Sequence, residues 1–449
     1  MLTCSKDNGA YGRPASLSIL ESLIMSIIQR LEQMAEISTI IHREEFDAEC
    51  SHLLNHKNAR LQVTALLALL ALTITAAHSV GQVLPRTTAT RKPPPRASYV
   101  GDEVCRTCHQ DKAKTFAETS HHLTSRLPME HAMAGKFIPG SNVLKTANPY
   151  LHFEMTANKD GYFQSAVEDI SSTKTVTRTE RIDIVTGSAR KGQSYLFWKD
   201  DQLFQLPVTY WTATDSWVNS PSYPDGSPHF DKAIIPRCLE CHGSYFDWLP
   251  PPVNRFNKTT LVLGITCERC HGPGRGHVAL NRSKALHATG QSQAIVNPAS
   301  LSRDRQLDVC GLCHSGAGTP IEPSLSFVPG DVLDDYIYIP YSSDDSEVDV
   351  HGSQIQLLKR SRCFQSSKTM TCTTCHDVHT VQRDAASFSP QCLSCHEPKQ
   401  CGEYPKLGEQ IAKDCVNCHM PLQESKVLFS NTGGKKIVPT VRNHRIAIY

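Results

Sequence analysis

Residues 266–277 read TCERCHGPGRGH, and the pentad Cys-x-x-Cys-His inside this stretch decides how the chain is organised. The chain carries seven such pentads. They are Cys105/Cys108/His109, Cys238/Cys241/His242, Cys267/Cys270/His271, Cys310/Cys313/His314, Cys372/Cys375/His376, Cys392/Cys395/His396 and Cys415/Cys418/His419. In each pentad the two thiols can add to the vinyl groups of a haem, and the histidine can bind its iron. The pattern therefore predicts seven covalently attached haem c groups.

Other sites also use a Cys-x-x-Cys pair, namely half of a zinc site, a thioredoxin-like dithiol and a structural disulfide. None of these sites requires a histidine directly after the second cysteine. The histidine is present in all seven pentads, and fourteen of the sixteen cysteines after residue 80 belong to the pattern. Zinc knuckles would also be expected in an even number. The pattern therefore favours haem attachment.

The composition is consistent with an interior built partly from cofactor. Hydrophobic residues make up 39% and aromatic residues 7% of the chain, which is low for an ordinary globular protein of this size. Arg269, Arg275 and the pair Lys359/Arg360 are candidates to bind haem propionates, although a solvated surface charge is the ordinary role of such residues. The formal net charge is only +2, and we expect no nucleic-acid partner.

An export signal is required, because the cytochrome c maturation machinery attaches haem outside the bacterial inner membrane. Lys57 and Arg60 precede an apolar run at 61–74, and small residues follow, so residues 57–79 are predicted to be a signal peptide. The run is shorter than the roughly 20 residues of a membrane-spanning helix. We expect cleavage, no stable membrane span afterwards and a periplasmic protein; an uncleaved anchor is the alternative.

The motifs divide the chain unevenly into segments. The segments are an N-terminal extension at 1–56, the signal peptide at 57–79, a Pro/Thr-rich leader at 80–98, a first haem segment at 99–149, a β-rich insert at 150–215 and a six-haem segment at 216–449. The extension is either a cytoplasmic addition or the result of a start codon assigned too far upstream, and the second interpretation is favoured.

The insert has the alternation of a half-buried sheet. Leu151, Phe153 and Met155 alternate with polar residues, and the runs at 194–198 and 202–208 predict a hairpin. This subdomain serves either as a structural spacer or as a docking surface. From residue 238 onward, Gly, Pro and Ser interrupt every periodic pattern. The expected fold is a multihaem cytochrome c made mainly of short α-helices and irregular loops around stacked haems, with a small inserted antiparallel β subdomain.

A second ligand opposite each proximal histidine would fill the remaining coordination position of the iron, whereas an open position would let a substrate bind. His277 lies on a Gly-rich loop six residues after His271, and His379 is too close to His376 to reach over the same porphyrin. These two histidines and the C-terminal His444 are the strongest candidates for distal ligands. Further candidates are His351, His229 and one of the neighbours His121 and His122.

Other ligands and sulfur chemistry remain open from the sequence. Methionine ligation is a lesser alternative, with Met129, Met133, Met155 and Met370 available. Cys363 and Cys401 lie outside the motifs, and they can form a disulfide, supply a distal thiolate or stay unpaired.

Several stretches resemble bacterial multihaem cytochromes c, of the superfamily that includes the tetrahaem electron acceptor of hydroxylamine oxidoreductase. They are YVGDEVCRTCH (99–109), GSARKGQSYL (187–196), LPVTYW (206–211), CLECHG (238–243), TCERCHGPGRGH (266–277), FVPGDVLDDY (327–336), SRCFQSSKTMTCTTCHDVH (361–379), CVNCHMP (415–421) and NHRI (443–446). The resemblance covers about residues 98–449. It implies that His277, His379 and a histidine at 121/122 are distal ligands, and that neighbouring haems stack in close pairs.

The chain departs from this superfamily in one respect, since it has no Cys-x-x-Cys-Lys motif. That variant marks the open catalytic haem of the superfamily's nitrite reductases, so its absence argues against that enzyme class. We expect a periplasmic seven-haem cytochrome, without catalytic residues, that relays electrons between redox protein donors and acceptors. The alternatives are an oxidoreductase acting on a small nitrogen or sulfur compound at one five-coordinate haem, and a docking subunit of a larger redox complex.

Overall fold

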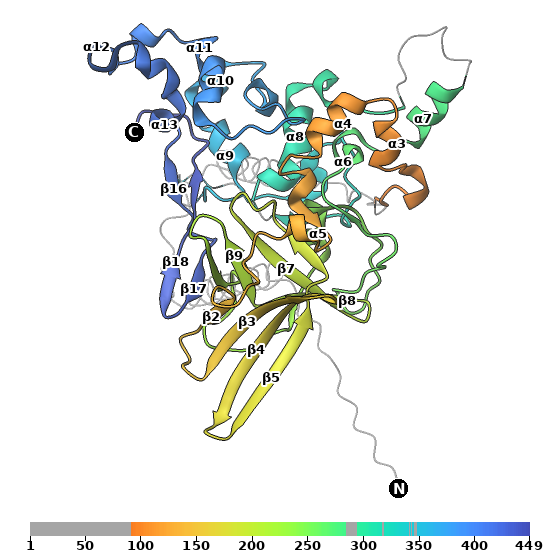
Figure 1. Cartoon of the computed structure of the whole chain (residues 1–449). Helices are drawn as coiled ribbons and strands as arrows, with labels where there is room; N and C mark the ends of the chain where they lie inside the picture. The colour runs from red at the N-terminus through yellow and green to blue at the C-terminus, as the bar shows by residue number, and fades with distance from the viewer. Residues whose placement is uncertain (1–90, 284–293, 317, 341, 343, 345–347) are drawn as a thin grey trace, which may run out of the picture. The chain divides into compact units, whose positions relative to one another are not determined.

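The computed structural model describes residues 91–449, apart from 284–293, 317, 341, 343 and 345–347 (Figure 1). The chain divides into two compact units, and every described residue belongs to the second, Thr88–Tyr449. The predicted extension and signal peptide therefore lie outside the described residues, as does most of the leader. Within the described part, no helix has the length and apolar character needed to cross a membrane.

A four-stranded antiparallel sheet follows the first motif, with its strands in the order β2-β3-β4-β5 (Figure 1). The strands are β2 (Val143–Lys145), β3 (Leu151–Asn158), β4 (Gly161–Ser171) and β5 (Lys174–Arg181). In β3 the alternating residues Leu151, Phe153 and Met155 are buried, as the period of two predicts. Phe153 pairs with Ala166 of β4, so the buried side chains of both strands share one face.

A seven-stranded sheet, also antiparallel, is built around one long strand. The strands are β1 (Ser125–Arg126), β6 (Ile184–Thr186), β7 (Gly192–Lys199), β8 (Gln202–Gln205), β9 (Val208–Trp211), β10 (Ser216–Asn219) and β11 (Lys232–Ala233). Strand β7 pairs with β6, β8 and β9. The β7–β8 pair confirms the predicted hairpin, and Asp200 takes a left-handed conformation with φ of 53° in its turn.

Side chains from both sheets form one apolar core, which includes Phe153, Tyr195, Phe197 and Trp217. Its aromatic rings meet edge to face, for example Phe137 and Trp217 with ring centroids 5.2 Å apart. Aromatic pairs in this geometry stabilise a core beyond their burial alone. The β region therefore has a complete hydrophobic core made from its own side chains.

The motifs lie on short helices or helical turns. The α-helices are α3 (Asp102–Arg106), α4 (Gln110–Phe116), α5 (Pro236–His242), α6 (Cys267–His271), α7 (Arg275–Arg282), α8 (Arg303–His314), α9 (Gln354–Lys359), α10 (Arg362–Ser366), α11 (Ser389–Leu393), α12 (Tyr404–Leu407) and α13 (Cys415–His419). The fifth motif begins on a 3₁₀ turn, η8 (Cys372–Thr374). These helices have at most 12 residues, so packing rather than helix propensity must stabilise them.

Small hairpins separate several of these helices. They are β12 (Gly243–Tyr245) with β13 (Val262–Leu263), β14 (Thr319–Pro320) with β15 (Ile337–Tyr338), β16 (Leu422–Glu424) with β19 (Thr440–Arg442), and β17 (Ser430–Thr432) with β18 (Lys435–Ile437). The predicted short helices are present, but the description of the chain as mainly helical is not confirmed, because two large sheets and four small ones share the fold. Strands such as β9, buried at all four positions, show no alternation that a sequence pattern could reveal.

Candidate haem-attachment sites

The motif turns place the two cysteines and the histidine of each pentad close together. In the first motif the backbone N–H of His109 donates to the carbonyl oxygen of Cys105 at 2.9 Å, and His376 and His396 repeat this bond to Cys372 and Cys392 at 2.9 Å. One helical turn brings positions i, i+3 and i+4 to the same face. All fourteen motif cysteines are free thiols. Each pentad therefore offers two thiols and an imidazole on one side of a turn.

Cys108, the second thiol of the first motif, is exposed, whereas Cys105 of the same motif is partly buried. The reason is local, because helix α3 ends at Arg106 and leaves Cys108 on the turn that follows. Its sulfur lies 3.8 Å from the hydroxyl of its neighbour Thr107. The attachment role of Cys108 stays a prediction from the pentad.

Three further motif thiols share this exposure. They are Cys238, Cys395 and Cys418, whereas the other motif thiols, Cys415 among them, are partly buried. The sixth and seventh motifs repeat the arrangement of the first, with the second cysteine exposed, whereas the second motif has its first cysteine exposed. In these four motifs the polypeptide therefore covers one of the two thiols more fully than the other.

Four imidazole pairs join a motif histidine to a histidine from elsewhere in the chain. Their ring centroids are 6.3 Å apart for His109 and His277, 6.2 Å for His271 and His379, 6.3 Å for His376 and His444, and 6.0 Å for His314 and His121. The first three pairs have nearly parallel rings, with interplanar angles of 22°, 21° and 27°. The fourth pair is nearly perpendicular, at 83°.

These separations fit a metal ion between two imidazoles. A transition metal binds an imidazole nitrogen at about 2.0 Å, and that nitrogen lies about 1.1 Å from its own ring centre. Two rings on opposite sides of one metal ion therefore have centroids about 6.2 Å apart. The four pairs thus have the spacing of two axial ligands that share one iron.

A fifth motif histidine, His242, has His351 as its neighbour. Burial lowers the pKa of His242, and the nearby imidazole of His351 lowers it further. The pKa of His351 is itself lowered mainly by burial and also by His314. The histidines of the second and fourth motifs therefore both lie near His351.

The remaining candidate ligands are placed differently. His396 and His419 have no aromatic ring partner among the described residues. The Nδ1 atom of His229 lies 3.5 Å from Asp231. His122 packs against the edge of Phe116 and lies 3.6 Å from a carboxylate oxygen of Asp102. Of the two neighbours at 121/122, it is thus His121 that meets a motif histidine.

Hydrogen bonds at Nδ1 orient several of these rings. Nδ1 of His271 lies 2.8 Å from the carbonyl oxygen of Val296, and Nδ1 of His419 lies 2.8 Å from that of Ala447. Nδ1 of His444 lies 3.1 Å from the carbonyl oxygen of Arg442. A carbonyl oxygen only accepts, so Nδ1 carries the proton and Nε2 keeps its lone pair for a metal.

Burial also keeps two of the distal candidates uncharged. It lowers the pKa of His121 to about 4, with further lowering by His314 and His376. Burial likewise lowers the pKa of His444 to about 4. Both imidazoles are therefore neutral at neutral pH, and the neutral imidazole is the form that binds a metal.

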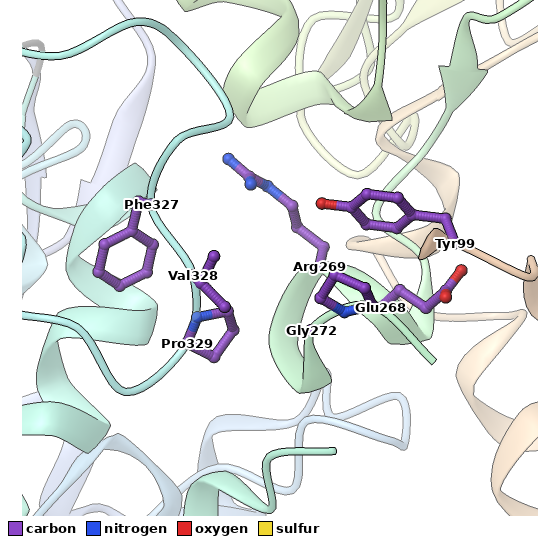
Figure 2. A pocket seen from close by; sticks show the side chains of 8 residues that line it. Tyr99, Glu268, Arg269, Gly272, Phe327, Val328 and Pro329 are labelled. Atoms are coloured by element: carbon purple, nitrogen blue, oxygen red, sulfur yellow. The ribbon is translucent and has the colours of Figure 1, made fainter. Parts of the chain in front are cut away.

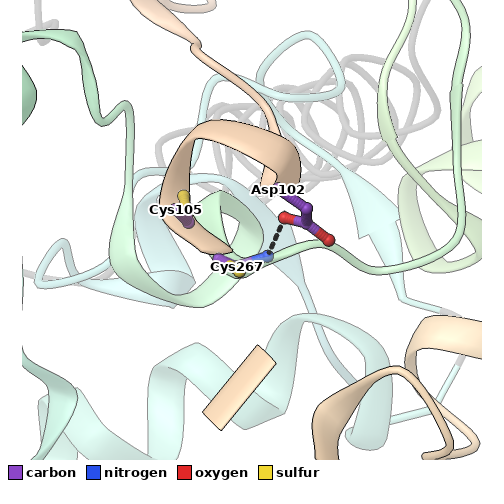
Figure 3. A group of neighbouring side chains, drawn as sticks. All are labelled: Asp102, Cys105 and Cys267. Carbon is purple, nitrogen blue, oxygen red and sulfur yellow. Dashed lines mark hydrogen bonds between the residues drawn. The ribbon is translucent and has the colours of Figure 1, made fainter. Parts of the chain in front are cut away.

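Thiols from different motifs lie next to one another. Asp102, Cys105 and Cys267 have their potential ligand atoms within 4.8 Å of one another, and Asp102 accepts a 2.9 Å hydrogen bond from the backbone N–H of Cys267 (Figure 3). Such a group could hold a metal ion, but both cysteines belong to haem-attachment motifs. Their closeness is better explained as the meeting of the first and third motifs.

Two glutamates inside the motifs bind neighbouring segments together. Glu268 is buried beside Tyr99 and Arg269 at a small pocket (Figure 2). Its carboxylate accepts hydrogen bonds from the backbone N–H groups of Val100, Gly101 and Gly274 at 2.8–2.9 Å. Three such donors compensate for burying a carboxylate. Glu268 therefore fixes the segment before the first motif to the third motif.

Glu240, in the second motif, is the centre of a buried charged cluster. Its carboxylate lies 2.9 Å from Arg237 and 3.7 Å from Arg269, and it accepts a hydrogen bond from the backbone N–H of Leu325 at 2.8 Å. Arg237 also donates to the carbonyl oxygen of Leu312 at 2.6 Å. The cluster joins three motifs. Sequence reasoning missed both glutamates, although their place between the cysteines of a motif was a usable signal.

Among the described residues, the two cysteines outside the motifs do not form a disulfide, which was one of the three alternatives that the sequence left open. Cys363 and Cys401 are both free thiols. Cys363 lies near Cys375 and Cys395 of the fifth and sixth motifs, whereas Cys401 lies near Cys418 of the seventh. The structure therefore places each of them beside a different motif thiol.

Comparisons with known proteins found one matching family model and similar solved structures. A family model described as "Cytochrome c554 and c-prime" matches residues 195–272. The outer cell wall cytochrome OcwA is a similar solved structure, with 18% identity over 78% of this chain and 79% of that chain and a TM-score of 0.48. An undecahaem cytochrome from the S-layer of Carboxydothermus ferrireducens has 16% identity over 78% of this chain and 54% of that one, with a TM-score of 0.37.

A search of curated proteins found no match. The cytochrome c554 match covers the second and third motifs, and the seven pentads extend the same attachment chemistry along the chain. Four of the seven motif histidines meet a second imidazole at the spacing of axial ligands. The family match therefore shows a similarity of residues 195–272, and the pentads outside that segment rest on their own spacing.

Proposed function

We propose that the protein is a seven-haem electron-transfer cytochrome that relays electrons between redox protein partners. The observation that carries the proposal is the set of four imidazole pairs with ring centroids 6.0–6.3 Å apart. The haem iron supplies reversible one-electron chemistry. Two imidazoles occupy both axial positions, so the residues around such an iron hold it and exclude substrate rather than make or break bonds.

Each residue has a definite role in this proposal. The fourteen motif cysteines attach the porphyrins, and the seven motif histidines are the proximal ligands. His277, His379, His444, His121 and His351 are the distal ligands opposite His109, His271, His376, His314 and His242, in that order. Backbone carbonyls at Nδ1 hold the proximal His271 and the distal His444 in the tautomer that binds iron.

The route to this state is also part of the proposal. The segment at 57–79 would direct export, the cytochrome c maturation machinery would attach the haems, and the mature protein would act in the periplasm or farther out in the cell envelope. The resemblance of residues 98–449 to the superfamily of the hydroxylamine oxidoreductase electron acceptor supports a relay between protein partners.

The proposal is tested by removing one distal ligand. In the purified haem-loaded protein, His277→Ala should convert one iron from low spin to high spin, because water or an empty position replaces an imidazole. His152→Ala is the matched control, since His152 lies 3.4 Å from Glu154 on a strand and joins no imidazole pair among the described residues. Electron paramagnetic resonance reads both variants. Identical spectra for the two variants would refute the ligand assignment.

A second candidate function is redox chemistry on a small nitrogen or sulfur compound at an open iron. It is favoured by His396 and His419, which meet no second imidazole among the described residues. If either iron is open, cyanide added to the resting protein will shift part of the absorption spectrum. A spectrum that cyanide leaves unchanged, with every iron low spin, would eliminate this second function.

A further inference from the structure

We propose that the fourth motif, Cys310–His314, is a junction at which the second, third and fifth motifs meet, so that electron flow is branched and does not follow the order of the motifs in the sequence. This inference rests on the proposed electron-transfer function. With the motifs numbered in sequence order, the proposed order of contact is 1–3–4–5–6–7. The second motif is a side branch that contacts the fourth.

Four of these contacts are made by the helices or turns that carry the motifs. Helix α3 of the first motif contacts α6 of the third, and α5 of the second contacts α8 of the fourth. Helix α8 also contacts η8 of the fifth motif, and α11 of the sixth contacts α13 of the seventh. The fourth motif is therefore in direct contact with the second and the fifth.

The thiols give the same arrangement at the level of atoms. Cys313 lies close enough to Cys241 of the second motif to influence its ionisation, and Cys372 of the fifth motif lies equally close to Cys310. The Cys105–Cys267 pair likewise joins the first and third motifs. A motif sulfur is bonded to the edge of its porphyrin after maturation. Two sulfurs in contact therefore bring two porphyrin edges together, which is the condition for rapid electron transfer.

The third motif is tied to this group through buried charges. Arg269 of the third motif and Arg237 both lie against Glu240 of the second, with side chains 8%, 13% and 7% exposed. Arg237 reaches the carbonyl oxygen of Leu312 inside the fourth motif. Cys270 is also close enough to Cys310 to influence its ionisation. The second, third and fourth motifs are thus held together by one cluster.

The junction has a ring geometry of its own. The rings of His314 and His121 are 83° apart, whereas the other three pairs lie within 27° of parallel. Perpendicular imidazole planes leave the d orbitals of a low-spin ferric iron nearly degenerate, and this condition produces one broad paramagnetic resonance signal at low field. Parallel planes give ordinary rhombic signals. The junction iron is therefore recognisable in the intact protein.

The experiment compares three distal-ligand variants of the full haem-loaded chain by electron paramagnetic resonance. His121→Ala opens the junction iron, His351→Ala opens the side branch, and His277→Ala opens the first site. Each should yield one high-spin signal. The signal should be broadest in His121→Ala, because three paramagnetic neighbours surround that iron and each of the other two has one. Only His121→Ala should abolish the low-field signal.

Equal line widths in the three variants, or loss of the low-field signal in another variant, would overturn the junction while leaving the ligand pairs intact. Failure of all three variants to give a high-spin signal would overturn the ligand pairs and the proposed function with them. If His121→Ala does not accumulate, His121→Met restores a sixth ligand. It should lose the low-field signal while the iron of the fourth motif stays low spin, and retention of that signal would overturn the junction.

Discussion

The β region at 143–235 and the last three motifs at 361–449 are stabilised in different ways. The β region buries Phe153, Tyr195 and Phe197 at 2% exposure or less in a shared core. Between residues 361 and 449, described throughout, the buried hydrophobic side chains are Phe364, Ile411 and Val416, each still 7% exposed. One region is held by its own side chains. The other has its interior arranged around thiols and imidazoles, so its stability must depend on the cofactor.

The largest expected effect follows from withholding haem. When the chain is produced without haem attachment, residues 361–449 should lose their fold, because little apolar burial remains to offset the conformational entropy of ordering them. Residues 143–235 should keep their sheets. Limited proteolysis with mass spectrometry measures both regions in one sample. Equal protection of the two regions without haem would contradict the comparison.

A cavity in the β core should destabilise the β region and leave the motif region unchanged. Phe153→Ala should lower the opening free energy of residues 143–235 by about 3–5 kcal/mol, because it removes a fully buried ring. Hydrogen exchange of the amides in that region measures this quantity. Ile170→Ala is the control, since Ile170 lies on β4 but is 55% exposed, and its effect should stay within about 0.5 kcal/mol. The low-spin haem spectrum should be unchanged in both variants.

The buried cluster around Glu240 gives a complementary test on the haem side. Glu240→Gln should cost about 3 kcal/mol, because it leaves Arg237 and Arg269 without their buried counter-charge. Thermal loss of the low-spin spectrum reports this change. Glu180→Gln breaks the more exposed pair with Arg178 and should cost at most about 1 kcal/mol. Similar melting temperatures for the two variants would show that the cluster does not position the motifs.

Acidification should lower the stability of the folded protein by a smaller amount. Burial lowers the pKa of His121 and His444 from 6.5 to about 4, so both stay neutral in the folded state while the unfolded chain takes up protons. Above pH 6.5 both groups are neutral in the folded and the unfolded chain. As the pH drops from 6.5 towards 4, only the unfolded chain takes up protons, so the free energy of unfolding falls. The free energy of unfolding should therefore be lower at pH 5.5 than at pH 7. Denaturant unfolding at the two pH values measures the loss, and His444→Ala should weaken the dependence.

The sequence alone predicted the parts of this molecule that local spacing controls. The motif turns, the alternation of Leu151, Phe153 and Met155, and the hairpin after Lys199 all follow from residues within one turn or one strand. The choice between His121 and His122 does not. The two are neighbours in the chain, and only the packing of Phe116 and Asp102 against His122 leaves His121 facing His314.

The order in which the motifs meet was equally hidden. Cys105 and Cys267 are far apart in the sequence, and no local pattern indicates that their sulfurs lie together while Cys108 stays exposed. The extent of the sheets was underestimated for a related reason, because β9 and most of β10 are buried at successive positions and lack a period of two. Long-range packing therefore decides the arrangement of the motifs, while local spacing decides their chemistry.

The most direct test of the central claim is the intact mass of the exported, mature protein, measured together with its absorption spectrum. Porphyrins organise the motif region in this account, so the protein should be red and should weigh its polypeptide plus seven haems. A colourless, folded preparation with the mass of the bare polypeptide would contradict it.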